Sequence, residues 1–377
     1  MATTLWWITL LQQQWSPLGI TSKVAYAATG DSDDDDKKNR ARSRQSLPAM
    51  VTLPLELVPA LGGAYVVHFY LFHEPFGAIL DTGSPFLTVP FRCNKFAYKY
   101  RWGCYRPERT IDSGYTNTLE AFDNNQGTVV WRKATFSFDH IDDDGTEDDK
   151  SRGTERLVFG VFDEALLDGP DGVFFGLIKD TDKWIRPSFM GQTGYTSFTV
   201  DLRNDPELNL KPKLILSKTS LIGALGENDN EDKEDYIPLV RDLYRKYKAP
   251  VVHYAACAHT LTFNGIPQVL DRSRRPTYII FDTGVTGMVI SQRLFNERYQ
   301  RARQNHEKSL WGTVQVGFQT KRGNIVELSA IKPVTTPLEG DSFAGYHGNV
   351  IVLGLAFLNG RVMTIDAQND KLQFCNC

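Results

Sequence analysis

The 377-residue sequence lacks a long apolar run, a dominant charge and a rich set of cysteines. Its N-terminal apolar stretch, Leu5–Leu11, is too short to span a bilayer, and no longer one follows, so we expect no transmembrane segment in the mature chain. The net charge of −3, with scattered Lys and Arg, excludes the basic surface typical of proteins that bind nucleic acid or membrane surfaces. There is no CxxC pair, no His pair at ligand spacing and no Asn-x-Ser/Thr sequon, so neither a zinc site nor N-glycosylation is predicted.

What is present predicts a large, mainly β protein. Hydrophobic residues make up 41% and aromatic residues 12% of the chain, and its length favours two domains. Helical periodicity is strongest in Ile237–Tyr247 and Gln292–Asn305, and the polar, proline-containing segment Leu202–Pro212 predicts the domain boundary. Short β-branched or aromatic runs bounded by turn residues predict strands at 65–72, 128–131, 135–138, 213–216 and 261–263.

The first 44 residues differ from the rest. The apolar stretch followed by Ala25-Tyr26-Ala27 predicts a signal peptide over residues 1–27, although the lack of a preceding basic residue leaves a plastid-type or other targeting leader open. Residues 28–44 are charged and of low complexity, which predicts a solvated pro-segment or linker that an activating protease cuts between Lys37 and Arg44. We therefore expect a secreted protein or one in an endomembrane lumen, with a vacuole or lysosome-like compartment included.

The five cysteines are typical of disulfides in a secreted chain. Cys93 and Cys104 bracket a short loop, and we expect them to bond. Cys257 is expected to bond either Cys375 or Cys377, which leaves one odd thiol.

An Asp-Thr-Gly triplet follows an apolar run twice, at Asp81 and at Asp282. A single triplet of this kind is most often a plain turn. Two such turns that face each other bring two carboxylates within hydrogen-bonding distance, where like charge prevents both from ionising and one proton is shared. The ionised member can then deprotonate a water while the protonated member donates to the carbonyl under attack. The repeated triplet therefore predicts amide hydrolysis without a covalent intermediate.

These motifs resemble those of a known family. Asp81-Thr82-Gly83-Ser84 and Asp282-Thr283-Gly284 are similar to the two active-site motifs of the pepsin-like aspartic proteases, and two further pairs of segments follow in family order. The resemblance covers roughly residues 50 to 377, and four motifs in order are more specific than any one of them. The further segments are Val158–Val161 with Asp171–Leu177, and Ile351–Gly354 with Phe357 and Met363–Asp366.

The resemblance implies a bilobal fold with two β-barrel-like lobes, at 45–205 and 206–377, and an active site in the cleft between them. It implies that Asp81 and Asp282 are catalytic, that the adjacent Thr82, Gly83, Thr283 and Gly284 support them, and that Gly176 and Gly354 close the ψ-shaped loops. It further implies an endopeptidase that acts on extended polypeptides as a monomer, without cofactor or metal.

Two departures from the family pattern concern the hairpin that covers the cleft. Many members carry Trp seven residues after the first Asp, where this chain has Thr88. The hairpin, or flap, is expected over residues 117–138 with its turn at Asp123–Asn125. Phe122 best matches the family's flap tyrosine, and Tyr115 is a weaker candidate. A Phe at this place can cover the cleft but has no hydroxyl.

A third departure is Val285. Ser84 can donate a hydrogen bond to Asp81, whereas Val285, at the equivalent place in the second motif, donates nothing. The loss of a donor raises the pKa of a buried carboxyl, so Asp282 is expected to ionise later than Asp81 and the activity optimum to be less acidic than is common in the family.

Two acidic segments, 140–150 and 226–235, are interpreted as solvated surface loops because the first does not fit a calcium-loop pattern. The rival to an enzyme is a catalytically inactive homologue that binds peptides or inhibits another enzyme through the same cleft. Both aspartates favour the enzyme, while the altered flap and Val285 keep the alternative open. No repeat supports a structural or adhesive role.

Overall fold

The computed structural model describes most of the chain from residue 47 to residue 375. The described ranges are 47–91, 93, 99, 101–122, 125–138, 154–163, 173–182, 185–223, 235–271, 274–305, 310–338 and 346–375. Several predicted features lie outside them: the signal peptide, the pro-segment with its cleavage site, the acidic segment 140–150, most of 226–235, the flap turn at Asp123-Asn124, Asp171-Gly172 and Cys377.

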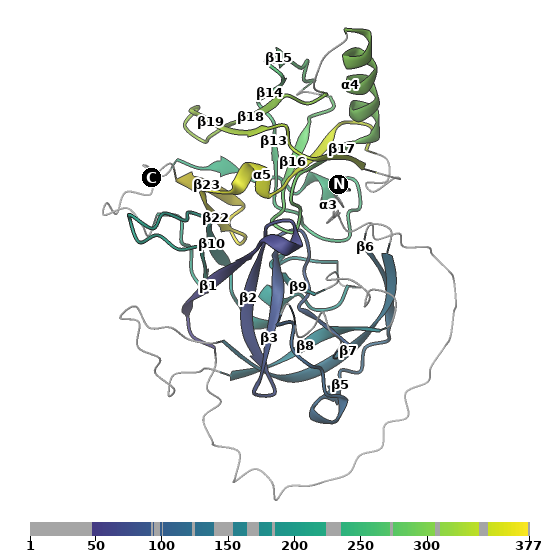
Figure 1. Ribbon diagram of the computed structural model, residues 1–377, viewed down its shortest axis with the longest axis vertical. Helices are drawn as coiled ribbons and strands as arrows, with labels where there is room; N and C mark the ends of the chain where they lie inside the picture. Colours follow the sequence, from purple (N-terminus) through teal and green to yellow (C-terminus); the bar gives the residue numbers. More distant parts are fainter. Residues whose placement is uncertain are drawn as a thin grey trace, which may run out of the picture.

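The protein is mainly β, as predicted. Its largest sheet, counted over the described residues, has 14 strands and extends from the C-terminal strands into the first half of the chain (Figure 1). The order along its path is β12 (Ile237–Pro238), β23 (Lys371–Cys375), β22 (Val362–Asp366), β10 (Ser197–Asp201), β11 (Lys213–Ser217), β1 (Met50–Val58), β2 (Ala64–Leu71), β7 (Asn125–Phe138), β8 (Thr154–Asp163) and β4 (Thr88–Pro90). Beside this path lie β3 (Glu74–Asp81), β9 (Phe174–Gly176), β5 (Ile111–Asp112) and β6 (Thr118–Phe122).

Two smaller sheets belong to the second half of the chain, in the upper part of Figure 1. One has the order β13 (Ala255–Cys257), β16 (Tyr278–Phe281), β21 (Val350–Leu353), β17 (Met288–Ser291) and β20 (Thr335–Leu338). The other has the order β15 (Ile266–Pro267), β14 (Thr260–Phe263), β18 (Thr313–Gln319) and β19 (Ile325–Ile331).

The strand predictions were confirmed at β2, β11 and β14, and the runs at 128–131 and 135–138 proved to be parts of the single long strand β7. The segment Leu202–Pro212, predicted as a domain boundary, connects β10 to β11, which pair with each other in antiparallel fashion. One continuous core cluster includes side chains from both halves of the chain, such as Phe69 and Ile365.

Among the described helices only α4 (Gln292–Gln304) is long. The short ones are α2 (Phe189–Thr193), α3 (Asp242–Arg245), α5 (Leu355–Leu358) and the 3-10 turns Pro59–Leu61 and Pro107–Arg109. The prediction of α4 was confirmed, since Leu294, Arg298 and Ala302 recur every four residues and are buried. The prediction of a helix over Ile237–Tyr247 was wrong. Ile237 pairs with Leu372 in the large sheet, and only the four residues of α3 are helical.

The predicted disulfide between Cys93 and Cys104 is present. The predicted bond from Cys257 is wrong, because Cys257 is a free, exposed thiol. It lies opposite Tyr278 at the end of β13, whereas Cys375 lies opposite Val362 in the large sheet.

Within the described ranges, no helix is both long and apolar enough to cross a membrane.

Candidate active site

The two Asp-Thr-Gly triplets end two strands of similar construction. β3 carries the apolar run that leads into Asp81 and pairs in parallel with β9, with Asp81 opposite Gly176. β16 leads into Asp282 and pairs in parallel with β21, with Phe281 opposite Leu353. Both runs are buried, as parallel strands covered on both faces usually are. Each strand therefore delivers its aspartate at the end of a rigid, fully packed element.

Gly176 and Gly354 lie in close contact with the backbone that follows each triplet. The Gly176 amide donates to the Phe86 carbonyl at 2.9 Å, and the Gly354 amide donates to the Gly287 carbonyl at 2.9 Å. A Cβ on Gly176 would lie 2.5 Å from the Phe86 nitrogen, and one on Gly354 would overlap the Val285 carbonyl oxygen. Only glycine allows this approach without a backbone shift.

Reciprocal threonine hydrogen bonds join the two triplets. The Thr82 hydroxyl donates to the Phe281 carbonyl at 2.9 Å and accepts from the Thr283 amide at 3.0 Å. The Thr283 hydroxyl donates to the Leu80 carbonyl at 2.8 Å and accepts from the Thr82 amide at 3.1 Å. Each side chain therefore bonds the backbone of the opposite triplet and of the residue just before it, which fixes the two loops relative to each other across some 200 residues of sequence.

The glycines let the two carboxyl groups meet. Gly83 and Gly284 each donate their amide to the aspartate two residues before them, at 2.7 and 2.8 Å. A Cβ on Gly83 would overlap the Asp282 carboxyl group, and one on Gly284 would lie 2.7 Å from Asp81 Oδ1. The Asp81 and Asp282 carboxyl groups are hydrogen bonded to each other, and each residue is only 4% exposed. The structure thus brings together the aspartates, threonines and glycines predicted from the sequence.

The two carboxyl groups differ in their pKa. Burial raises the pKa of Asp81, while Ser84, Asp282 and nearby amides act in the opposite direction. Burial and then the charge of Asp81 raise the pKa of Asp282 well above its usual value, and the groups that lower it are the Gly284 and Gly83 amides. Of the two carboxyl groups, Asp282 is therefore the one whose environment favours the protonated form more strongly.

The side chains that follow the triplets contribute to this difference. Ser84 is buried near Asp81, where it lowers the pKa of that carboxyl, although within the described ranges its hydroxyl has no hydrogen bond of standard geometry. Val285 is also buried and packs in a small apolar cluster with Ile280 and Val352. The direction of the difference agrees with the prediction from Ser84 and Val285. Burial is the largest cause of the raised pKa at both carboxyl groups, and they differ because the Asp81 charge raises the pKa of Asp282 while Ser84 lowers that of Asp81.

Thr88, at the place where pepsin-like aspartic proteases often have Trp, forms a hydrogen bond between two strands. Its hydroxyl accepts a hydrogen bond from the Phe174 amide at 2.7 Å and so ties β4 to the start of β9. The predicted hairpin is formed by β6 and β7, with Phe122 opposite Asn125 at its end. The side chain of Phe122 lies outside what the structure describes, and Tyr115, before β6, is 41% exposed.

Two residues at the base of this hairpin were missed in the sequence. Trp131 is buried, packs edge-on against Phe86 at 4.8 Å and donates its indole N–H to the Thr118 hydroxyl at 3.0 Å. The Arg186 guanidinium lies over the rings of Tyr115 and Trp131, at 5.6 and 6.0 Å, and donates to the Thr116 hydroxyl at 2.8 Å. The strand register places Val129 opposite Thr118, so Trp131, two residues further along the same strand, is a diagonal neighbour of Thr118. This contact can be predicted from the sequence only if the position of the hairpin turn is known.

No protein-family model matches the sequence, and no curated protein matches it either. Among the residues that the structure describes, no cluster of His, Cys, Asp and Glu is arranged to hold a metal ion.

The first prediction concerns the threonine bonds. Thr82→Val should lower the free energy of unfolding by about 2–4 kcal/mol, because it removes a buried donor and leaves the Thr283 amide without its acceptor. Thr199→Val is the matched control, since it removes a buried hydroxyl that bonds Thr364 in the large sheet, away from both triplets. Urea unfolding measures both, and equal losses would contradict a special role for Thr82.

The second prediction concerns the hairpin base. Trp131→Phe keeps an aromatic ring against Phe86 but removes the donor to Thr118, so the hairpin should open more often. Amide hydrogen exchange in β6 should become about tenfold faster or more, while exchange in β22 stays unchanged. Unchanged protection of β6 would show that the indole hydrogen bond does not hold the hairpin.

Proposed function

We propose that the protein is an aspartic endopeptidase of the pepsin-like type, with Asp81 and Asp282 as its catalytic pair. The observation that carries the proposal is the reciprocal bonding of Thr82 and Thr283, which holds two buried carboxyl groups in contact at the ends of two parallel-paired strands. Such an arrangement is costly, because two desolvated carboxyl groups repel each other when ionised. A shared-proton dyad is the chemistry that makes use of it.

In the proposed reaction Asp81, the ionised member, takes a proton from a water held between the two carboxyl groups. Asp282, which keeps its proton, donates to the oxygen of the scissile carbonyl as the water attacks. The resulting tetrahedral intermediate collapses when the leaving nitrogen receives a proton from the pair and the C–N bond breaks. No covalent enzyme intermediate and no cofactor is needed.

The proposal includes a bilobal arrangement, with polypeptide substrate extended across the cleft between two lobes and the β6–β7 hairpin over it. The similar construction around β3 and β16, each with a parallel partner and a glycine behind it, supports this arrangement. It also includes a monomeric, secreted or lumenal protein activated near Arg44, which rests on the sequence alone. The alternative is an inactive homologue that binds peptides, which Thr88 in place of Trp favours.

The third prediction tests the function directly. Protein trimmed near Arg44 should cleave a pooled peptide library between about pH 3 and 7, and a statine-type transition-state mimic should abolish cleavage. Asp81→Asn and Asp282→Asn should each abolish it, because either change removes one of the two proton-transfer roles. Asp201→Asn is a matched control, since Asp201 is buried in β10 and pairs with Arg203.

A wild-type protein that cleaves no peptide at any pH would refute the proposed enzymatic function. If the mimic still bound to silent protein, the peptide-binding alternative would be supported.

The fourth prediction concerns pH. Activity requires Asp81 ionised and Asp282 protonated, so it rises as the pH passes the pKa of Asp81 and falls as it passes that of Asp282. Because the pKa of Asp282 is raised most, the alkaline limb should lie at higher pH than is common in the family. Val285→Thr supplies a donor equivalent to Ser84 and should move that limb to lower pH. A pH–rate profile with an unmoved alkaline limb would contradict the role given to Val285.

A further inference from the structure

One residue outside the two triplets, Tyr254, is bonded next to both of them, through its side chain on one side and its backbone on the other. Tyr254 lies just before β13, and its hydroxyl donates to the Leu177 carbonyl at 2.6 Å. The amide of the same Leu177 donates to the Asp81 carbonyl at 2.9 Å. On the other side, the Tyr254 carbonyl accepts from the amide of Phe281, the residue before Asp282, at 3.1 Å. Tyr254 therefore links the backbone at Asp81 to the backbone at Asp282 through two short hydrogen-bonded paths.

The chain around Tyr254 is fixed on both sides. The Val252 amide donates to the Asp180 carbonyl and the Asp182 amide to the Pro250 carbonyl, both at 2.9 Å. Thr181 and Val251 form a bridge between these bonds. Residues 177–182, which follow Gly176, are thus paired with residues 250–254, which precede β13. We refer to these two paired segments as the Tyr254 strap.

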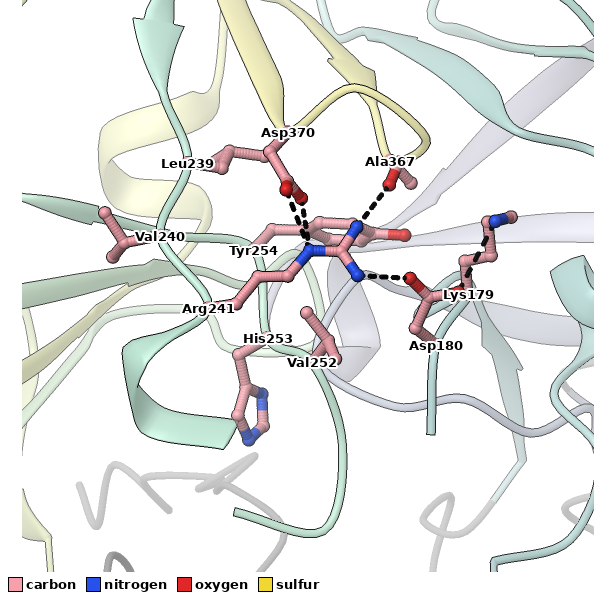
Figure 2. Close-up of a pocket in the computed structure, with 10 residues that line it drawn as sticks. All are labelled: Lys179, Asp180, Leu239, Val240, Arg241, Val252, His253, Tyr254, Ala367 and Asp370. Carbon is pink, nitrogen blue, oxygen red and sulfur yellow. Dashed lines mark hydrogen bonds and ion pairs between the residues drawn. The ribbon is translucent and has the colours of Figure 1, made fainter. Parts of the chain in front are cut away.

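An ion cluster anchors the strap to the C-terminal strands, and Figure 2 shows it around the Arg241 guanidinium. Arg241 Nε bonds both oxygens of Asp370, at 2.7 and 2.8 Å, and Nη1 bonds Asp180 at 2.8 Å. Its Nη2 donates to the Ala367 carbonyl at 3.2 Å. The single guanidinium therefore holds the strap against the turn between β22 and β23.

Tyr254 itself has little freedom to move or to titrate. It is 4% exposed, and its ring packs edge-on against Phe198 at 5.4 Å. Burial raises the pKa of its phenol, with the Asp180 and Asp370 charges acting in the same direction and Arg241 against them, so the hydroxyl stays a donor at any working pH. The neighbouring His253 points away from the guanidinium in Figure 2, and burial lowers its pKa to about 4.

We propose that Tyr254 is a positioning residue for the dyad, which it serves by fixing the backbone of Asp81 relative to that of Asp282 through the strap. The inference rests on the proposed function, to which it adds a third connection beside the two threonines. Tyr254 contacts neither carboxyl group, so its effect is on the geometry of proton transfer. Small misplacements of reacting groups are known to cost large factors in rate.

The fifth prediction is a comparison of Tyr254→Phe with Tyr195→Phe. The control matches well, because Tyr195 is also buried and donates its hydroxyl to a backbone carbonyl, that of Pro48, at 3.1 Å. Both variants should lose a similar amount of thermal stability. Only Tyr254→Phe should lower kcat, by about tenfold or more with KM within about twofold, and move the alkaline limb of the pH profile to lower pH as the carboxyl groups separate.

Wild-type kcat and an unmoved pH profile in folded Tyr254→Phe would overturn the inference, and so would equal changes in Tyr195→Phe. If Tyr254→Phe does not fold, Arg241→Lys is measured instead, since Lys cannot bond both Asp180 and Asp370 in the plane of a guanidinium. Carboxyl-carbon NMR titration of the dyad gives a second readout that needs no substrate. A wild type without activity defeats the proposed function, whereas an Asp282 titration that the substitution leaves unchanged defeats the strap.

Discussion

Two carboxyl groups in contact inside a protein repel each other as soon as both ionise, so the remainder of the structure has to hold them together. The Thr82 and Thr283 side chains do this with four hydrogen bonds to backbone groups of the opposite triplet and of the residue just before it. Buried bonds of this kind are expensive to break, because each lost partner leaves a desolvated polar group. The strands that carry the triplets are themselves held, because β3 pairs in parallel with β9 and β16 pairs in parallel with β21. Residues from both halves of the chain thus offset the repulsion between the two carboxyl groups.

A symmetric frame carries an asymmetric pair of groups. Equivalent glycine amides bond the two carboxyl groups, yet the pKa values differ. The pKa of Asp282 is raised well above its usual value, whereas the rise in the pKa of Asp81 is partly offset by Ser84. General acid–base chemistry needs this division, since one group has to accept a proton while the other donates. Both carboxyl groups are equally buried, so the difference comes from the Asp81 charge that acts on Asp282 and from Ser84 beside Asp81.

The sequence was most informative where one local pattern decides the structure. Each Asp-Thr-Gly triplet follows a buried strand, and α4 shows one periodic face, so both could be predicted from a few neighbouring residues. The segment Ile237–Tyr247 misled because its apolar residues serve a strand and packing against the sheet, and the partner of Ile237 is Leu372, far along the chain. The same reason explains why the bond predicted for Cys257 was wrong and why Trp131 and Tyr254 were not identified from the sequence. Their roles depend on partners, or on the lack of one, that only the folded chain shows. Periodicity reports the environment of a residue but not its distant partner.

The place of the C-terminal strands has a consequence for biosynthesis. β22 and β23 lie in the large sheet beside β10, and the turn between them holds Arg241 and so the strap beneath the dyad. A ribosome makes these strands after the other strands that the structure describes, and chains fold from the N-terminal side as they emerge. Until they are made, Arg241 lacks both Asp370 and the Ala367 carbonyl, so the strap is not anchored. Under the function proposed, full positioning of the dyad therefore waits until these two strands have been synthesised.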